Sequence, residues 1–292
     1  MLTIGVINNM PLAAIQSTER QFRDVLHAAG TGLSFELRWF RLAGARPDTY
    51  KNLDDLWRSR FDGLIVTGTE PKANSLADEP LWGPLTRTID WSAQHTSSVI
   101  WSCLSAHAAV LYLDGVERRA QSEKIFGIYD SMKLDDHPLL ANIQSVWPVP
   151  HSRWNDLSET DLVVRGYTVL AKSSDAGVDL FVKQQQKSLF VFVQTHPEYA
   201  GDTLLREYRR DLALFHTGQR ATCPRVPHNY FDDRITAALE TLRRDIITDP
   251  QNIAMRHLEQ VEVPNGWKPT ATQLYRNWLL YLASARQDMG VS

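Results

Sequence analysis

Short apolar runs alternate with segments of helical spacing over roughly the first two thirds of the chain. Strands are predicted where these runs are rich in β-branched and aromatic residues, over residues 2–7, 33–42, 63–67 and 98–102. Helices are predicted between them, over residues 14–29, 51–60 and 80–95. This alternation predicts an α/β fold with a mostly parallel, doubly wound sheet, flanking helices and a ligand site at the carboxyl ends of the strands.

The rest of the chain has a less regular pattern. Further strands, joined as hairpins, are expected over residues 162–171, 177–183 and 188–194. Amphipathic helices are expected over residues 203–215, 235–247 and 272–285. Because no repeat or linker interrupts the chain, we expect a single domain over residues 1–292, with a core over 1–220 and a helical extension over 221–292 packed on it.

Composition and charge narrow the class of function. An apolar fraction of 43% in 292 residues is enough for an enzyme-sized core. The net charge is only −3 and no dense Lys/Arg block occurs, which argues against nucleic acid or a membrane surface as partner. Without a signal-peptide pattern or an apolar run of about 18 residues, and with only two cysteines, the chain is predicted to be cytoplasmic and to act on small molecules.

Two strand ends carry residues with reactive side chains. An apolar run ends at Cys103, where a helix is expected to begin, so the helix N-terminus would favour the thiolate and supply N–H donors. A second run, at residues 190–193, leads to His196 with Glu198 after it. A single buried cysteine is often only structural, and Glu198 alone could be a helix N-terminal charge. Together the three residues predict a nucleophile, a base and a carboxylate that orients the base.

The chain resembles the homoserine O-succinyltransferase/O-acetyltransferase family, which has the class I glutamine amidotransferase-like fold. The motifs that carry this resemblance are Asp62 to Gly68, Cys103 with Ala108 and Ala109, Ser122 to Gly127, Pro150 to Arg153, His196 to Tyr199, and Asn229 to Phe231. Spaced motifs in the same order over nearly the whole chain are not expected by chance.

The resemblance implies ping-pong transfer of a succinyl group from succinyl-CoA to the hydroxyl of L-homoserine, in methionine biosynthesis. It implies that Cys103 carries the acyl group as a thioester, that His196 is the general base and that Glu198 supports it. By position in the motifs, the implied substrate-binding residues are Lys124, Ser152 and Arg210. For the oxyanion hole we propose the N–H of Leu104 and a backbone N–H near Gly68.

The donor and the acceptor stay open at this stage. Lys72 occupies a position that, in the family, separates succinyl from acetyl donors; its charge favours succinyl-CoA, and its bulk favours acetyl-CoA. Serine or another amino-acid hydroxyl is an alternative acceptor. His107, one helical turn after Cys103, stands where the family commonly has glutamine and could replace its hydrogen bond or add an acid or base.

Other classes of function are less favoured. A glutamine amidotransferase-like hydrolase would share the fold and the Cys-His-Glu set, but the residues around Cys103 lack the usual glycines. A noncatalytic binding module is disfavoured by the intact Cys103, His196 and Glu198. No His, Cys or Asp spacing resembles a metal site, so we expect neither metal nor cofactor, with acyl-CoA as a substrate. A homodimer is a further possibility for an enzyme of this kind.

Overall fold

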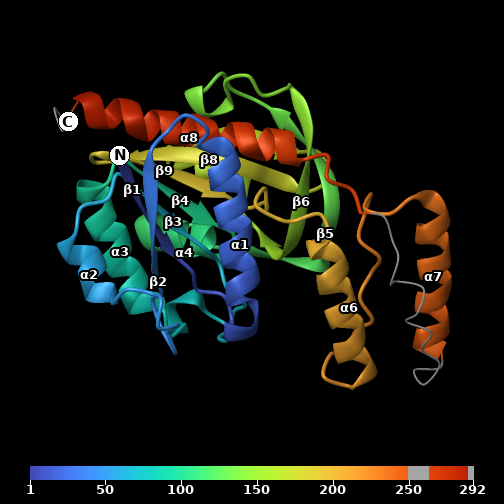
Figure 1. Cartoon of the computed structure of the whole chain (residues 1–292). Helices are drawn as coiled ribbons and strands as arrows, with labels where there is room; N and C mark the ends of the chain where they lie inside the picture. The colour runs from blue at the N-terminus through green and yellow to red at the C-terminus, as the bar shows by residue number, and fades with distance from the viewer. Residues whose placement is uncertain (249–262, 289–292) are drawn as a thin grey trace.

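The computed structural model describes residues 1–248 and 263–288 (Figure 1). The strands in chain order are β1 (Leu2–Ile7), β2 (Phe35–Phe40), β3 (Gly63–Val66), β4 (Ser98–Ser102), β5 (Arg119–Lys133), β6 (Val146–Asp156), β7 (Thr168–Ser173), β8 (Gly177–Gln185) and β9 (Ser188–Val193). The α-helices are α1 (Leu12–Ala29), α2 (Leu53–Arg58), α3 (Trp82–His95), α4 (Leu104–Asp114), α5 (Glu159–Val164), α6 (Thr203–His216), α7 (Asp233–Thr248) and α8 (Lys268–Asp288), with short 3-10 turns η1 (Leu76–Asp78) and η2 (Pro138–Leu140).

The strands of the described residues form one sheet in the order β2-β1-β3-β4-β9-β8-β7-β5-β6. The first five of these strands, β2 to β9 in that order, are parallel, as the alternation of strands and helices predicts. The remaining four strands continue the sheet through antiparallel pairs. The carboxyl ends of β3, β4 and β9 therefore lie side by side, and Gly68, Cys103 and His196 follow these ends in the chain.

Each face of the parallel strands is covered by helices, because successive side chains point to opposite faces. Val99 and Trp101 of β4 pack into the cluster that includes α3 and α4, whereas Ile100 packs into the cluster that includes α1 and α8. Helix α8 crosses the molecule beside α1 (Figure 1). The Trp278 Nε1–H donates to Ser98 Oγ at 2.9 Å, which joins α8 to the start of β4.

A third apolar cluster lies around α6 and α7 at one side of the molecule (Figure 1). Leu204 and Leu212 of α6 meet Leu239 and Ile246 of α7 there. The chain between these helices is also tied to the sheet, since the Ile128 N–H donates to the carbonyl of His228 at 2.8 Å. The predicted boundary between residues 220 and 221 stays a prediction, and part of the extension lies outside the described residues.

Two parts of the sequence prediction differ from the structure. The strand expected over 162–171 is wrong at its start, because Ser158 caps α5 by accepting a hydrogen bond from the Asp161 N–H at 3.3 Å. Strands β5 and β6 were not predicted. Strand β6 contains Pro148 and Pro150, which argue against a strand in sequence, but β6 is the edge of the sheet, where proline is tolerated.

Candidate active site

Cys103 lies at a sharp turn between β4 and α4. Its backbone has φ 52° and ψ −116°, a conformation that residues with a side chain rarely adopt. The turn is fixed on the sheet side, because the Cys103 N–H donates to the carbonyl of Val193 at 2.7 Å, and on the helix side, because its carbonyl accepts from Ala106 and His107. The thiol is therefore presented at the sheet edge and at the N-terminus of α4.

His196 and Glu198 follow β9 directly and face this turn. Glu198 is buried, and its Oε1 lies 2.9 Å from His196 Nδ1. Burial alone would lower the pKa of His196, but the Glu198 carboxylate and the hydrogen-bonded Cys103 sulfur together raise it to about 10. At neutral pH the imidazole is therefore protonated and can stabilise a thiolate on Cys103.

The residues proposed for the oxyanion hole lie against the same turn. The Leu104 N–H is a free donor at the start of α4, with no acceptor among residues 1–248 and 263–288. A Cβ on Gly68 would lie 3.0 Å from this nitrogen and 3.2 Å from Cys103 Cβ. The glycine therefore leaves open the space in front of the donor, which is where an oxyanion would need to sit.

A cavity of about 470 Å³ joins these groups. It contains every sequence-predicted site residue except Lys72, namely Gly68, Cys103, Leu104, Lys124, Ser152, His196, Glu198 and Arg210. Lys72 is exposed and does not line this cavity, although its backbone N–H donates to Glu79 Oε1 at 2.6 Å. Its side chain is thus not brought together with the other predicted site residues.

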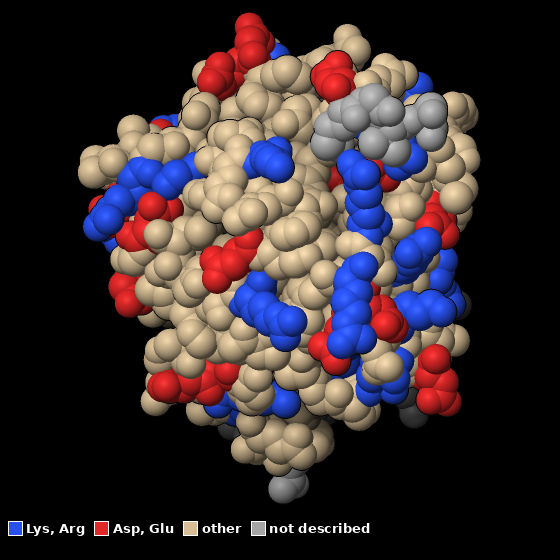
Figure 2. Space-filling view, turned by 90° about the vertical axis from the view of Figure 1, so that its left-hand side faces the viewer, with Lys and Arg blue, Asp and Glu red and all other residues tan. Residues whose placement is uncertain are grey.

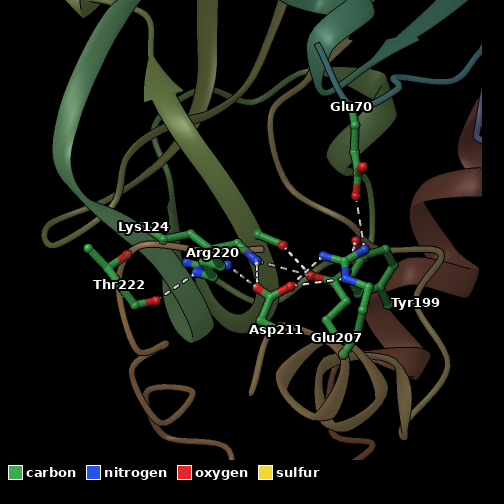
Figure 3. Close-up of polar contacts among 9 residues, drawn as sticks. Glu70, Lys124, Tyr199, Glu207, Asp211, Arg220 and Thr222 are labelled. Carbon is green, nitrogen blue, oxygen red and sulfur yellow. Dashed lines mark hydrogen bonds and ion pairs between the residues drawn. The ribbon is translucent and has the colours of Figure 1, made fainter. Parts of the chain in front are cut away.

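Charged groups from β5 and α6 also line this cavity and form an ionic cluster (Figure 3). Lys124 Nζ lies 3.3 Å from Glu207 Oε2 and 3.4 Å from Asp211 Oδ2. Burial would raise the pKa of Glu207, but Lys124 and the hydrogen bonds from Ser152 and Tyr199 lower it. The carboxylate is therefore charged although it is partly buried, and it holds Lys124 in place.

Ser152 and Tyr199 are positioned by the same carboxylate. Ser152 Oγ donates to Glu207 Oε2 at 2.5 Å, and the Tyr199 hydroxyl donates to Glu207 Oε1 at 2.6 Å. The Tyr199 ring stacks on the His196 ring, with centroids 4.2 Å apart and an interplanar angle of 16°. Tyr199 thus connects the ionic cluster to the predicted base.

Arg210 lines the cavity, is exposed and is held by two carboxylates. Its guanidinium contacts Asp211 Oδ1 at 2.8 Å and Glu70 Oε1 at 2.9 Å. Arg220 contacts the second oxygen of Asp211 at 2.8 Å. A substrate carboxylate that binds Arg210 would therefore replace or share an existing ionic partner.

His107 also lines the cavity but differs from His196 in its partner. Its Nε2 lies 2.7 Å from Gln194 Oε1, and Gln194 in turn donates to the carbonyl of Val178. This arrangement assigns the His107 proton to Nε2. Burial lowers the pKa of His107 to about 3, so the ring is neutral at physiological pH. Of the two roles considered for His107, the geometry fits the hydrogen-bonding role.

Sequence reasoning missed Glu207, Asp211 and Arg118, which also line the cavity. Glu207 and Asp211 lie one helical turn apart on α6, so both project toward Lys124. Charged residues on an amphipathic helix normally face water, so the sequence gives no reason to place these two residues in a cavity. Their only signal is that they lie close to Arg210 in the sequence. Nothing in the sequence distinguishes Arg118 from its neighbour Arg119.

Metal-binding clusters and membrane-spanning helices are absent from the described part of the chain. No group of His, Cys, Asp and Glu is placed to hold a metal ion, and no helix is long and apolar enough to cross a membrane. Both cysteines are free thiols. On the face in Figure 2, basic and acidic side chains are interspersed, so no field of one sign covers it.

The fold places this site in a known structural class. A glutamine amidotransferase from Thermotoga maritima aligns with a TM-score of 0.53 over 89% of this chain and 99% of its own, at 15% sequence identity. The predicted class I glutamine amidotransferase-like fold is thereby confirmed. The likeness concerns the fold alone, since the sequences have diverged.

Sequence comparison identifies the family within that class. The homoserine O-succinyltransferase family model matches residues 1–289. The homoserine O-succinyltransferase of Rhodopseudomonas palustris is 43% identical over 97% of this chain and 89% of its own length. That of Methylorubrum extorquens is 43% identical over 95% and 86%, respectively. The chain belongs to the homoserine O-succinyltransferase family. This finding confirms the predicted resemblance and the prediction that the chain is an acyltransferase.

Proposed function

We propose that this chain transfers a succinyl group from succinyl-CoA to the hydroxyl of L-homoserine through a thioester on Cys103, as a step in methionine biosynthesis. The names of the relatives support the donor and the acceptor. One observation carries the mechanism: Cys103 is held at a strained turn against His196, whose other nitrogen contacts Glu198 at 2.9 Å. Acyl-CoA is then a substrate, and the cysteine itself is the acyl carrier, so no cofactor is needed.

In the first half-reaction, the Cys103 thiolate attacks the thioester carbonyl of succinyl-CoA. The Leu104 N–H is placed to stabilise the oxyanion beside Gly68. The bond from carbon to the CoA sulfur then breaks, and the CoA thiolate takes the proton from the His196 imidazolium. Because one thioester replaces another, this exchange is nearly balanced in free energy.

In the second half-reaction, His196 is neutral and removes the proton from the homoserine hydroxyl as its oxygen attacks the Cys103 thioester. The Glu198 carboxylate stabilises the imidazolium that forms. Collapse of the intermediate releases O-succinylhomoserine and returns the thiolate. Lys124, Ser152 and Arg210, which line the same cavity, are the residues proposed to hold the amino acid.

The test is the intact mass of the protein after mixing with succinyl-CoA, followed by addition of homoserine. We expect one added succinyl group, absent in Cys103→Ala and retained in Cys223→Ala, the matched control at the other free thiol. Homoserine should discharge the adduct and yield the ester. Parallel reactions with acetyl-CoA and with serine test the alternative donor and acceptor.

Two outcomes would contradict the proposal. An adduct that forms only from acetyl-CoA, or that only serine discharges, would replace the donor or the acceptor. A protein that forms no adduct and releases no CoA with either acceptor would instead direct attention to a glutamine amidotransferase-like hydrolase.

We place the reaction in the cytoplasm, where acyl-CoA is found and the thiol stays reduced. A homodimer remains a prediction for measurement of mass in solution.

A further inference from the structure

One cation in the cavity differs from the others in its partners. The basic side chains that line the cavity are Arg118, Lys124, Arg153, Arg210 and Arg220. Four of them form ion pairs, Lys124 with Glu207 and Asp211, Arg153 with Asp156, Arg210 with Glu70 and Asp211, and Arg220 with Asp211. For Arg118, no carboxylate lies within ion-pair distance in residues 1–248 and 263–288.

Arg118 is also partly withdrawn from water and close enough to Cys103 to sense its charge. It lies on the short connection between α4 and β5 and is half-buried. Burial lowers the pKa of Arg118, while the charges of Glu79, Cys103 and Glu117 act in the opposite direction. Glu79 is already engaged, since its Oε1 accepts from the Lys72 and Ala73 N–H groups. A half-buried guanidinium without a close counter-ion favours binding of an anion.

We propose that Arg118 binds the free carboxylate of the succinyl group and so makes the enzyme selective for a succinyl donor. This inference rests on the succinyl transfer proposed above. The free carboxylate is separated from the reacting carbonyl by a pair of methylene groups, so it must lie in the same cavity as Cys103. A guanidinium matches a carboxylate by two parallel, charge-assisted hydrogen bonds. Lys72 is exposed outside the cavity, and Lys124 is committed to two carboxylates, so neither is as well placed.

The experiment compares a charged donor with an uncharged donor of similar length. The ratio kcat/KM is measured at saturating homoserine with succinyl-CoA and with butyryl-CoA, for the wild type, Arg118→Gln and Arg118→Lys. We expect Arg118→Gln to lose about 10- to 100-fold with succinyl-CoA, because the neutral amide can replace at most one of the two charge-assisted hydrogen bonds. With butyryl-CoA it should lose nothing, which also shows that the variant folds. Arg118→Lys keeps the charge without the fork and should lose less.

The matched control is Arg119→Gln, which removes the same charge one residue further along. Arg119 is exposed and contacts Asp161, so both donors should be unaffected. An equal loss with both donors in Arg118→Gln and Arg118→Lys would overturn the proposal and indicate contact with the CoA phosphates instead. Unchanged kinetics would also overturn it. A wild-type protein that transfers no succinyl group to homoserine would overturn the proposed function itself, and this inference with it.

Discussion

The two walls of the cavity are built in different ways. The wall that carries Cys103 and His196 is formed by ends of parallel strands, and its positions are fixed mainly by backbone hydrogen bonds. The wall that carries Lys124 and Glu207 is formed by β5 and α6, and ion pairs between side chains hold it. Tyr199 joins the two walls by stacking on His196 and donating to Glu207.

Because of this difference, the first wall is suited to the chemical reaction and the second wall is suited to recognition of the substrate. A nucleophile and its base must be held within a fraction of an ångström, and a sheet edge provides that rigidity. Ionic partners can be exchanged, so the second wall can accept a charged amino acid by replacing contacts that already exist. Changes in the first wall should therefore act on kcat, and changes in the second wall should act on KM for the acceptor.

The largest effect is expected for Gly68→Ala in the first wall. A methyl group there would lie 3.0 Å from the Leu104 nitrogen, and would block the space in front of this donor. We expect kcat to fall about 10²- to 10³-fold, the usual loss when one oxyanion donor is removed. Steady-state kinetics check this. The control is Gly83→Ala, at a glycine where a Cβ would meet nothing within 4 Å. A normal kcat for Gly68→Ala would exclude this oxyanion hole.

The next effect concerns stability in acid and the neutral His107, which lies one helical turn after Cys103. Its pKa is about 3 in the folded protein, so below about pH 6.5 the unfolded chain binds a proton that the folded chain does not. The wild type should therefore lose about 2 kcal/mol of unfolding free energy from this group between pH 7 and pH 5.

His107→Gln removes this titration, and the difference between variant and wild type is measured by urea unfolding at both pH values. His27→Gln, at an exposed position of α1, is the matched control and should behave as the wild type. If His107→Gln loses as much stability in acid as the wild type, His107 is protonated in the folded protein and the assigned hydrogen bond to Gln194 is wrong.

The smallest effect is expected in the second wall, for Glu207→Gln. The neutral amide weakens the hold on Lys124 and the hydrogen bonds from Ser152 and Tyr199. We expect KM for homoserine to rise about tenfold, with a much smaller change in kcat, because one charged hydrogen-bond network is weakened. Glu70→Gln alters an exposed ion pair with Arg210 and should have little effect. A fall in kcat alone would show that the two walls do not act separately.

The difference between the two walls also explains how much of the fold and of the site can be predicted from the sequence. The first wall is visible in sequence because an apolar run that ends in a polar or reactive residue marks a strand end, as at Cys103 and His196. The parallel half of the sheet is predicted for the same reason. Glu207 and Asp211 have no such mark, since a charged helix residue looks the same whether it faces water or a cavity.

Lys72 and Arg118 also show the limit of predicting site residues from the sequence. Alignment of motifs gave Lys72 a role in donor choice, but the loop places its side chain in solvent. Arg118 has no signal of its own in the sequence, and its lack of an ion-pair partner among the described residues is evident only from the three-dimensional structure. Tertiary contacts between distant segments decide both cases.

Helix α8 has a consequence for how the chain is made. It covers the face of the sheet that contains Ile100, and Trp278 lies so close that a Cβ on Gly63 would be 2.8 Å from its ring. Because a chain leaves the ribosome from its N-terminus, α8 is the last of the described elements to emerge. Until then, α1 covers only its own part of that apolar face, and the part that α8 covers is open to water and to other nascent chains. Protection from aggregation and assembly of the active site are thus completed by the same late helix.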